Sequence, residues 1–189
     1  VLALRLRSLP SAVVYGSTTG VYGDCSGEWI DETRRLQPQT ARAQRRVNAQ
    51  DWVNFLGKSG YPRTQVLRIP GIYALDREGG TPRERLLRGT PVLQAKEDVY
   101  TNHIHADDLA RATVLAMWRG KPLRPMNICD QANMKMGDYM DSVAAMWGLA
   151  KPPRISREQA NLQLSPMVMS FLNESRRIHA DRMMQELRL

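Results

Sequence analysis

The sequence has few cysteines and no long apolar run. Cys25 and Cys129 are its two cysteines, too few for the disulfide framework of a small secreted domain. No apolar stretch approaches the roughly 20 residues that a membrane-spanning helix needs. Arg5 and Arg7 interrupt the apolar residues at the start of the chain, which argues against a secretory signal peptide. These features predict a cytoplasmic protein with reduced thiols and no membrane partner.

Histidine is also scarce, so few side chains of the kinds that most often ligate metals are available for a metal site. His103 and His105 lie two residues apart with Asp107 beyond, so in a strand all three would share one face. The run 106–108, Ala-Asp-Asp, is instead typical of a helix start, because acidic residues favour the positive end of a helix. A helix there would rotate Asp107 away from the histidines. No other cluster of His or Cys occurs, and we predict no metal site.

A glycine-rich phosphate loop is missing as well. No Gly-x-Gly-x-x-Gly precedes a helix, so the usual fingerprint of a dinucleotide site is absent from these residues. The net charge is +8, and a basic balance can indicate a nucleic-acid partner. Here the arginines are scattered, and the densest groups, at 42–46 and 176–177, fall at helical spacing without interleaved aromatics. We therefore predict no nucleic-acid partner, because a small anionic ligand accounts for the charge equally well.

Short apolar runs alternate with helical patterns along the whole chain. The runs Ala12–Tyr15, Gln65–Ile69 and Met126–Ile128 are typical of buried parallel strands. A helix is expected over 39–58, where Val47, Trp52, Val53, Phe55 and Leu56 form an apolar stripe for packing on a sheet. Further helices are expected over 82–88, 106–118, 136–147, 156–164 and 179–187, and the end of one over 2–7. This alternation predicts an α/β protein with a parallel sheet.

Hydroxyl groups follow the first strand directly, at Ser17 and Thr18. A buried parallel strand that ends in hydroxyls and glycines places them at the carboxyl edge of its sheet. In open α/β sheets, ligands bind at that edge. The sequence therefore predicts a ligand site at the end of the strand.

The residues after this strand resemble a known family. Thr18–Gly23, Thr-Thr-Gly-Val-Tyr-Gly, is followed by Pro38 and the helix over 39–58. This order is similar to the central segment of the NAD-dependent epimerase/dehydratase family, the extended short-chain dehydrogenase/reductases. Three further blocks match in family order and extend the resemblance over nearly the whole chain: Leu67–Tyr73, Asn102–Ala110 and Met126–Asp130.

The chain departs from the family at its Tyr-x-x-x-Lys motif. Arg42 stands at the tyrosine and Arg46 at the lysine, which resembles the atypical subgroup that lacks the active-site tyrosine. A guanidinium keeps its proton at physiological pH, so Arg42 can clamp an anion but cannot act as a base. Arg46 remains a cation that can donate to ribose hydroxyls. Both arginines are also compatible with an ordinary solvated helix face.

The resemblance implies a Rossmann-like doubly wound parallel sheet with a small, mostly helical substrate lobe. The first strands and the glycine-rich loop of that sheet would be absent from this chain. Residues 1–72 would form the C-terminal half of the dinucleotide-binding domain and residues 73–189 the substrate lobe, with 106–130 returning to the sheet. The helix over 39–58 is the candidate surface for a homodimer.

The implied activity is that of an NAD(P)-dependent epimerase, dehydratase or oxidoreductase acting on a nucleotide sugar or a similar small polar, anionic molecule. The alternative is a non-catalytic NAD(P)-binding sensor or scaffold. Without the tyrosine, the candidate proton carriers are Tyr22, Asp24, Tyr73, His103 and His105. The implied site residues are catalytic Thr18, Arg42 and Arg46; cofactor-binding Ser17, Thr18, Arg46, Pro70, Gly71 and Ile72, for NAD or NADP; and substrate-binding Tyr73, Asn102 and His103.

Overall fold

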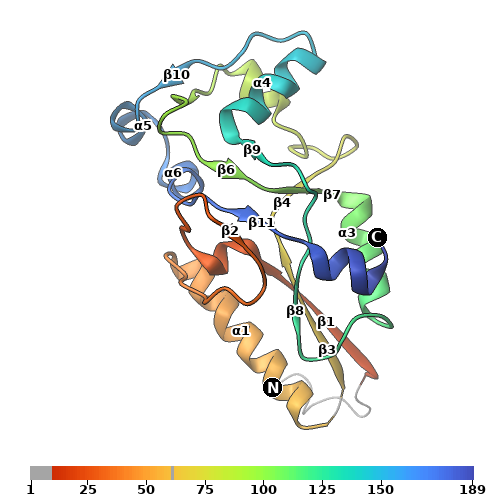
Figure 1. The fold of residues 1–189 in the computed structure, drawn as a ribbon. Helices are drawn as coiled ribbons and strands as arrows, with labels where there is room; N and C mark the ends of the chain where they lie inside the picture. The colour runs from red at the N-terminus through yellow and green to blue at the C-terminus, as the bar shows by residue number, and fades with distance from the viewer. Residues whose placement is uncertain (1–9, 61) are drawn as a thin grey trace.

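The computed structural model describes residues 10–60 and 62–189 (Figure 1). The helix end expected over residues 2–7 lies outside them. At the centre is a parallel sheet in the order β1-β3-β8, formed by β1 (Ala12–Thr18), β3 (Arg63–Ile69) and β8 (Pro125–Asn127). Val66, Leu67 and Met126 on these strands are buried. The three parallel strands predicted from short apolar runs are therefore confirmed.

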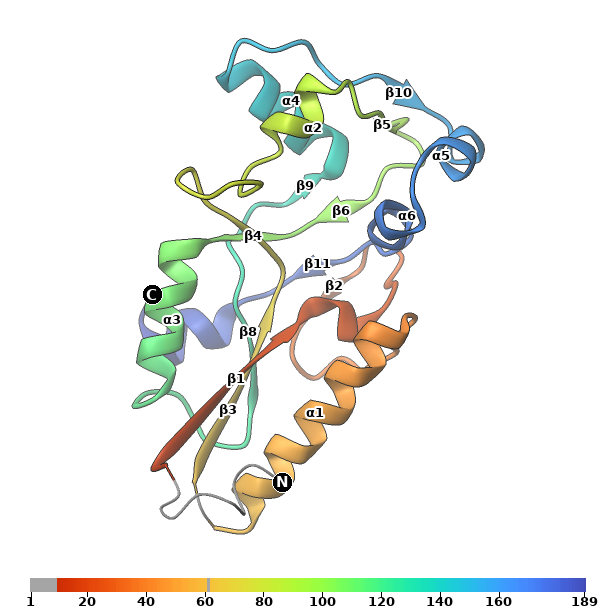
Figure 2. The same ribbon diagram turned by 180° about the vertical axis from the view of Figure 1, so that it is seen from behind.

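Helix α1 (Ala41–Lys58) crosses one face of this sheet (Figures 1 and 2). It begins at Ala41, two residues after the predicted start, because the Thr40 hydroxyl accepts a hydrogen bond from the Ala43 N–H at 3.1 Å and caps the helix. Ala43 and Gln50 are buried against the sheet, but Trp52 and Phe55 are 69% and 66% exposed. The expectation that these two aromatics pack on the sheet is wrong, since they lie on the outer face of the helix.

The other face of the sheet is covered by α3 (Ala106–Ala116) and by the C-terminal residues (Figure 2). Ala112 and Ala116 share the main hydrophobic core with the buried strand residues. The C-terminal segment contributes Ile178 and Leu187 to that core, through strand β11 (Arg177–Ile178) and a π-helix, η3 (Met183–Leu187). Strand β11 pairs in parallel with β2 (Trp29–Ile30) in a separate two-stranded sheet.

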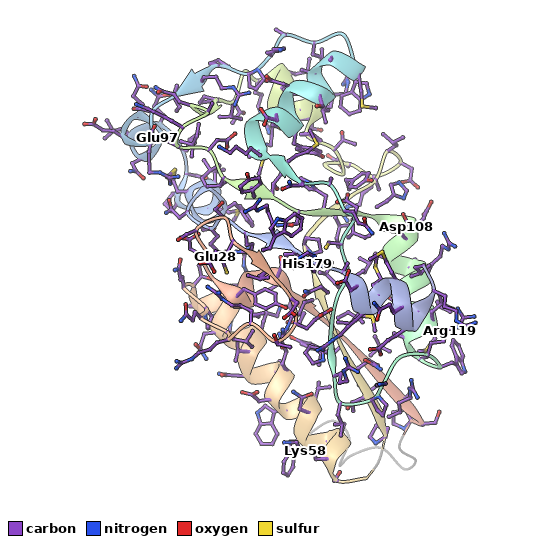
Figure 3. The ribbon with its side chains drawn as sticks, viewed as in Figure 1. Glu28, Lys58, Glu97, Asp108, Arg119 and His179 are labelled. Atoms are coloured by element: carbon purple, nitrogen blue, oxygen red, sulfur yellow. The ribbon has the colours of Figure 1, made fainter. Side chains whose placement is uncertain are left out.

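A smaller, mostly helical lobe sits beyond the carboxyl ends of the strands (Figure 1). Figure 3 shows Lys58 at the end of α1 and Glu97 beside α5, at opposite ends of the molecule. Two separate hydrophobic clusters form the lobe, one around Leu93 and Leu172 and the other around Val92 and Met140. Its elements are α2 (Arg83–Leu87), β5 (Val92–Leu93), β6 (Tyr100–Thr101), β9 (Met134–Lys135), α4 (Met136–Met146), β10 (Arg154–Ile155), α5 (Arg157–Gln163) and α6 (Pro166–Leu172).

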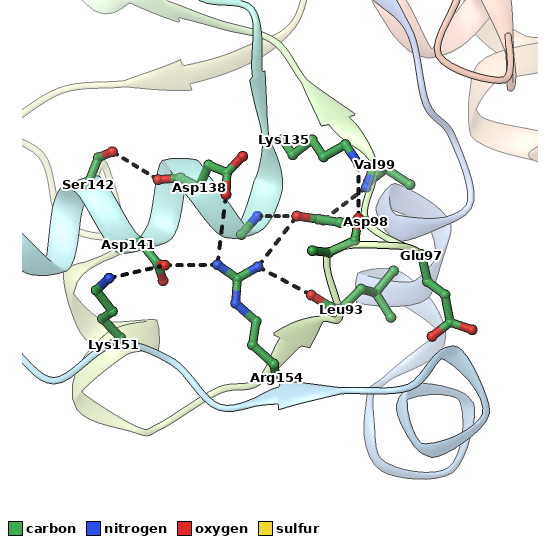
Figure 4. A network of polar contacts seen from close by, with 12 residues as sticks. Leu93, Glu97, Asp98, Val99, Lys135, Asp138, Asp141, Ser142, Lys151 and Arg154 are labelled. Atoms are coloured by element: carbon green, nitrogen blue, oxygen red, sulfur yellow. Dashed lines mark hydrogen bonds and ion pairs between the residues drawn. The ribbon is translucent and has the colours of Figure 1, made fainter.

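A polar network ties these lobe elements together around Arg154 (Figure 4). Its guanidinium lies 2.9 Å from the Asp141 carboxylate and 3.6 Å from that of Asp98. The Asp98 side chain is 1% exposed and also accepts the Gly137 N–H at 2.9 Å. Because each buried charge has a charged or hydrogen-bonding partner, the network fixes the start of α4 relative to β5 and β10.

Candidate active site at the strand ends

A cavity of about 570 Å³ lies between the sheet and the lobe. Its floor is the turn after β1 and the junction at Pro70–Gly71 between β3 and β4 (Gly71–Tyr73). One wall is the first turn and a half of α1, and the opposite walls come from 99–103 and from 167–176. The cavity is therefore at the carboxyl edge of the parallel sheet, where the hydroxyl residues after the first strand predicted a ligand site.

Thr18 lies at the end of β1 and lines this cavity. Its hydroxyl oxygen accepts the Gly20 N–H at 3.2 Å and so caps the short 3₁₀ helix η2 (Thr19–Tyr22). A hydroxyl that accepts one hydrogen bond still has its own hydrogen to donate. Thr18 can therefore cap the turn and contact a ligand at the same time.

Arg42 and Arg46 both line the cavity from one face of α1, as residues four apart on a helix should. The Arg46 guanidinium donates to the Tyr15 hydroxyl at 3.1 Å and to the Gly16 carbonyl at 3.3 Å, so it reaches the end of β1. The Arg42 guanidinium lies 5.2 Å from the centroid of the Phe171 ring on α6. Neither forms an ion pair with a carboxylate in the described part of the chain.

Two more arginines, Arg85 and Arg176, complete a strongly basic lining. Burial lowers the pKa of Arg85, and among the described residues it has no carboxylate partner. Arg176 is buried and pairs with the Glu174 carboxylate at 2.8 Å. Four guanidiniums thus face the single carboxylate found among the described lining residues, a charge balance that suits an anionic ligand.

His103 and Asn102 enter the cavity from the start of β7 (His103–His105). The His103 ring stacks on Tyr139 with centroids 4.1 Å apart. Burial lowers the pKa of His103 to about 4, so its imidazole is neutral near pH 7. The Asn102 amide donates to the Arg176 carbonyl at 3.0 Å and holds the lobe segment against β7.

Three residues expected to contact the cofactor or the substrate do not line the cavity. Ser17 is buried, and its hydroxyl accepts the Gln50 side-chain N–H at 2.5 Å. Its place follows from strand geometry, because successive side chains point to opposite faces and only Thr18 points to the cavity. Ile72 and Tyr73 continue along β4 beyond the cavity, and the Tyr73 ring packs edge-on against His105 at 5.2 Å.

The remaining candidate proton carriers are engaged elsewhere. Tyr22 is buried, donates to the Asn127 side chain at 2.7 Å and accepts from Arg68 at 2.8 Å, and burial raises its pKa. Asp24 accepts the Ser175 N–H at 2.8 Å. The His105 ring accepts the N–H of Asp107 at 3.2 Å and caps α3. Each of these side chains has a structural partner and lies outside the cavity lining.

Among residues 10–60 and 62–189, no three His, Cys, Asp or Glu side chains gather in a way that could hold a metal ion. No helix in the same residues is long and apolar enough to cross a membrane.

Sequence reasoning missed Arg85, Glu174 and Arg176 as lining residues. They come from segments far from the motif around Thr18, and none stands in a recognisable pattern. Arg176 and Arg177 fall at helical spacing, but Arg177 begins strand β11, and Arg176 lies just before it, buried and paired with Glu174. Their positions depend on how the lobe packs, which local sequence does not encode.

No family model matches the sequence, and no curated protein does. Solved structures do match. A functionally unknown conserved protein from Silicibacter pomeroyi is 32% identical, with a TM-score of 0.81 over 99% of this chain and 62% of that one. UDP-glucose 4-epimerase from Thermotoga maritima, solved with UDP-glucose, is 18% identical, with a TM-score of 0.73 over 94% and 57%. A human epimerase family protein with NADPH is 15% identical, with a TM-score of 0.71 over 96% and 61%.

These likenesses show that the chain has a Rossmann-type fold with a lobe arranged as in the UDP-glucose 4-epimerase structure. At 15–18% identity these likenesses show the fold alone, and they confirm the Rossmann-like fold that the resemblance implied. The chain spans about six tenths of the length of the structures it matches.

Proposed function

We propose that this chain forms the substrate-facing part of an NAD(P)-dependent epimerase/dehydratase-type oxidoreductase that acts on an anionic sugar nucleotide. The observation that carries the proposal is the cavity at the carboxyl ends of β1 and β3. The Thr18 hydroxyl lines this cavity together with four guanidiniums and one carboxylate. A strongly basic cavity that also presents hydroxyl and amide side chains suits a polyhydroxy ligand that carries phosphate or carboxylate.

The residues present fit the nicotinamide–ribose end of a dinucleotide. Arg46 already reaches the end of β1, where its remaining N–H groups are placed to donate to ribose hydroxyls. The backbone at Pro70–Gly71 closes the floor beside it. The nicotinamide, once bound, supplies hydride transfer. Thr18 would hydrogen-bond the reacting hydroxyl or carbonyl of the substrate.

The anionic part of the substrate would lie against Arg42 and Arg85. Both guanidiniums line the cavity without a carboxylate partner in the described residues, so an anion bound there would neutralise their charge. Arginine binds phosphate and carboxylate in a bidentate way, which lysine cannot do. Arg42 on α1 and Arg85 on α2 would thus hold the charged group while the strand ends hold the reacting carbon.

A non-catalytic role is the second candidate, and Arg42 at the tyrosine position favours it. A guanidinium cannot exchange the proton that a catalytic tyrosine exchanges. The experiment that separates the two is a turnover assay of the full-length gene product with NAD⁺ or NADP⁺ and a panel of UDP-, GDP- and dTDP-sugars. Turnover supports the enzyme; cofactor binding without turnover of any panel member supports the sensor or scaffold.

The outer face of α1 is proposed as a homodimer surface. Trp52 and Phe55 lie there, mostly exposed, with their rings in an edge-to-face contact at 5.9 Å. Contiguous exposed apolar patches mark interaction surfaces, and aromatic residues are enriched at protein interfaces. A second copy of the same helix is the simplest partner for this face.

A further inference from the structure

The proposed reaction needs a group that takes a proton from the substrate, and the usual tyrosine is absent. Apart from the arginines, the cavity lining within the described residues offers three titratable side chains: Tyr100, His103 and Glu174. His103, with its pKa lowered to about 4 by burial, is a weak base and stacks on Tyr139. The Tyr100 ring is covered by Arg177, whose guanidinium carbon lies 4.7 Å from its centroid. Glu174 is the remaining acceptor.

Glu174 follows α6 and lies beside the end of β1. It is only 9% exposed, although it carries a carboxylate. A methyl group placed on Gly20 would lie 3.6 Å from the Thr18 hydroxyl oxygen and 3.9 Å from Glu174 Oε2. The hydroxyl and the carboxylate therefore flank the same side of Gly20, and the absence of a side chain there leaves the space between them open.

The carboxylate is held in place through one of its two oxygens. Oε2 accepts from Arg176 Nη1 at 2.8 Å, and the same nitrogen donates to the Gly23 carbonyl at 2.7 Å. The second oxygen, Oε1, has no hydrogen-bond partner in the part of the chain that the structure describes. A buried, charged group with a free acceptor beside a cavity is arranged to receive a hydrogen bond from a ligand.

We propose that Glu174 is the catalytic proton acceptor of this site and that Arg176 is its positioning residue. This assignment rests on the proposed function. The O–H bond of a substrate alcohol breaks, and its proton forms a new O–H bond with Glu174 Oε1. The electron pair stays on the substrate oxygen and becomes the second bond of a carbonyl, while the carbon loses the hydride that a bound nicotinamide would accept. In the reverse direction, protonated Glu174 returns the proton to the oxygen.

Thr18 and Arg176 have distinct parts in this arrangement. The Thr18 hydroxyl donates to the substrate oxygen and aligns it with the carboxylate. Arg176 fixes the carboxylate through Oε2 while Oε1 remains available. In this arrangement the base, Glu174, comes from the lobe and the hydroxyl donor, Thr18, comes from the sheet. The two groups therefore approach the substrate from opposite sides of the cavity, unlike in the tyrosine-based arrangement.

The test uses the full-length gene product and the substitution Glu174→Gln, which keeps an oxygen for Arg176 but cannot take a proton. We expect kcat to fall by about 100-fold or more, the usual contribution of a general base, for the sugar nucleotide that wild type turns over. NAD(P)H affinity, measured by fluorescence titration, should change less than twofold. Glu158→Gln, on the exposed face of α5, is the matched control and should leave both values unchanged.

A second measurement needs no substrate. Carbodiimide coupling of glycinamide to the wild-type protein, mapped by mass spectrometry, should label Glu174, and NAD(P)H with UDP should protect it. An unlabelled Glu174, or full turnover in the Glu174→Gln variant, overturns the assignment while leaving the proposed function intact. Loss of turnover in Tyr100→Phe with Glu174→Gln fully active would move the role to Tyr100. A wild type that neither binds cofactor nor turns over any substrate contradicts the proposed function itself.

Discussion

Single side chains decide the charge of the cavity. Arg42, Arg46 and Arg85 bring guanidiniums to its walls with no carboxylate partner among the described residues. Such groups keep their charge at every physiological pH. A cavity lined in this way binds anionic ligands in preference to neutral ones. Each arginine should contribute separately to the binding of an anion.

Arg42→Tyr restores the residue type that the family uses at this position. In the full-length protein it should weaken the binding of UDP by about 1–3 kcal/mol, the scale for losing a charged hydrogen bond. NAD(P)H affinity should be nearly unchanged, because Arg46 reaches the end of β1 without Arg42. Calorimetric titration of both ligands measures this. Arg45→Tyr, on the exposed side of the same helix, is the control, and equal UDP affinity in all three proteins would contradict an anion clamp at Arg42.

His103 should make stability depend on pH. Burial lowers its folded-state pKa to about 4, below the ordinary value of about 6.5. As the pH falls below 6.5, the unfolded chain therefore binds a proton that the folded protein does not. The free energy of unfolding therefore falls as the pH drops from about 6.5 to about 4, and at pH 5 it is about 2 kcal/mol lower than at pH 7.

Urea unfolding at pH 7 and pH 5 measures this loss in wild type and in His103→Gln. Other groups titrate in the same range, so the informative quantity is the difference between the two proteins. The variant should lose about 2 kcal/mol less than wild type between the two pH values. An identical pH dependence would show that the imidazole is not buried in its neutral form.

Among the elements, β1, α1 and β3 are joined by a buried polar chain. Gln50 on α1 donates to the Ser17 hydroxyl at 2.5 Å, and its side-chain oxygen accepts from Arg68 Nη2 at 3.2 Å. Arg68 continues the chain to Tyr22 at 2.8 Å. Each of these side chains is buried, so the sheet and the helix are held in register by polar contacts that cannot be replaced by water.

Gln50→Leu should break this chain while keeping the side-chain volume. It leaves donors of Arg68 and the hydroxyl of Ser17 unsatisfied in the interior, at a cost of about 2–4 kcal/mol in the free energy of unfolding. Chemical denaturation measures the change. Gln44→Leu removes an exposed hydrogen bond to Asn48 on the same helix and should cost less than about 0.5 kcal/mol. Equal effects of the two substitutions would show that the buried chain adds no stability.

The elements differ in how far the sequence predicts them. The three strands of the main sheet and helix α1 follow from apolar runs and from the Thr40 cap, because these signals are local. The pairing of β2 with β11 involves two residues on each side, too short for any periodic pattern. The orientation of Trp52 and Phe55 was also missed, since an apolar stripe does not say whether its partner is the sheet or another molecule.

The candidate site shows the same limit. Thr18, Arg42, Arg46 and His103 were found through separate motifs of the family resemblance, and the structure brings all of them to one cavity. Glu174 was not found, because it belongs to a loop whose place is set by the ion pair with Arg176 and by lobe packing. Long-range packing of this kind cannot be predicted from local sequence patterns.

At the scale of the whole molecule, the exposed aromatics on α1 should control assembly. If two copies associate through this helix, Trp52→Glu combined with Phe55→Glu places four charges in an apolar interface and should convert a dimer to a monomer. Sedimentation velocity of the full-length protein measures the change. Lys58→Glu, at the end of the same helix, is the control and should leave the assembly unchanged. A wild type that is monomeric at tens of micromolar would contradict the dimer surface.

The central claim is that the cavity at the strand ends binds NAD(P) through Arg46. The most direct measurement is a fluorescence titration of NADH and NADPH against the full-length protein, against its Arg46→Ala variant, and against these 189 residues alone, which have no glycine-rich phosphate loop. We predict micromolar affinity in wild type for one of the two dinucleotides. The Arg46→Ala variant should bind it about 1–3 kcal/mol more weakly, and the 189 residues alone should bind it weakly or not at all. Full-length wild type that binds neither dinucleotide, or an Arg46→Ala variant of unaltered affinity, would contradict the account.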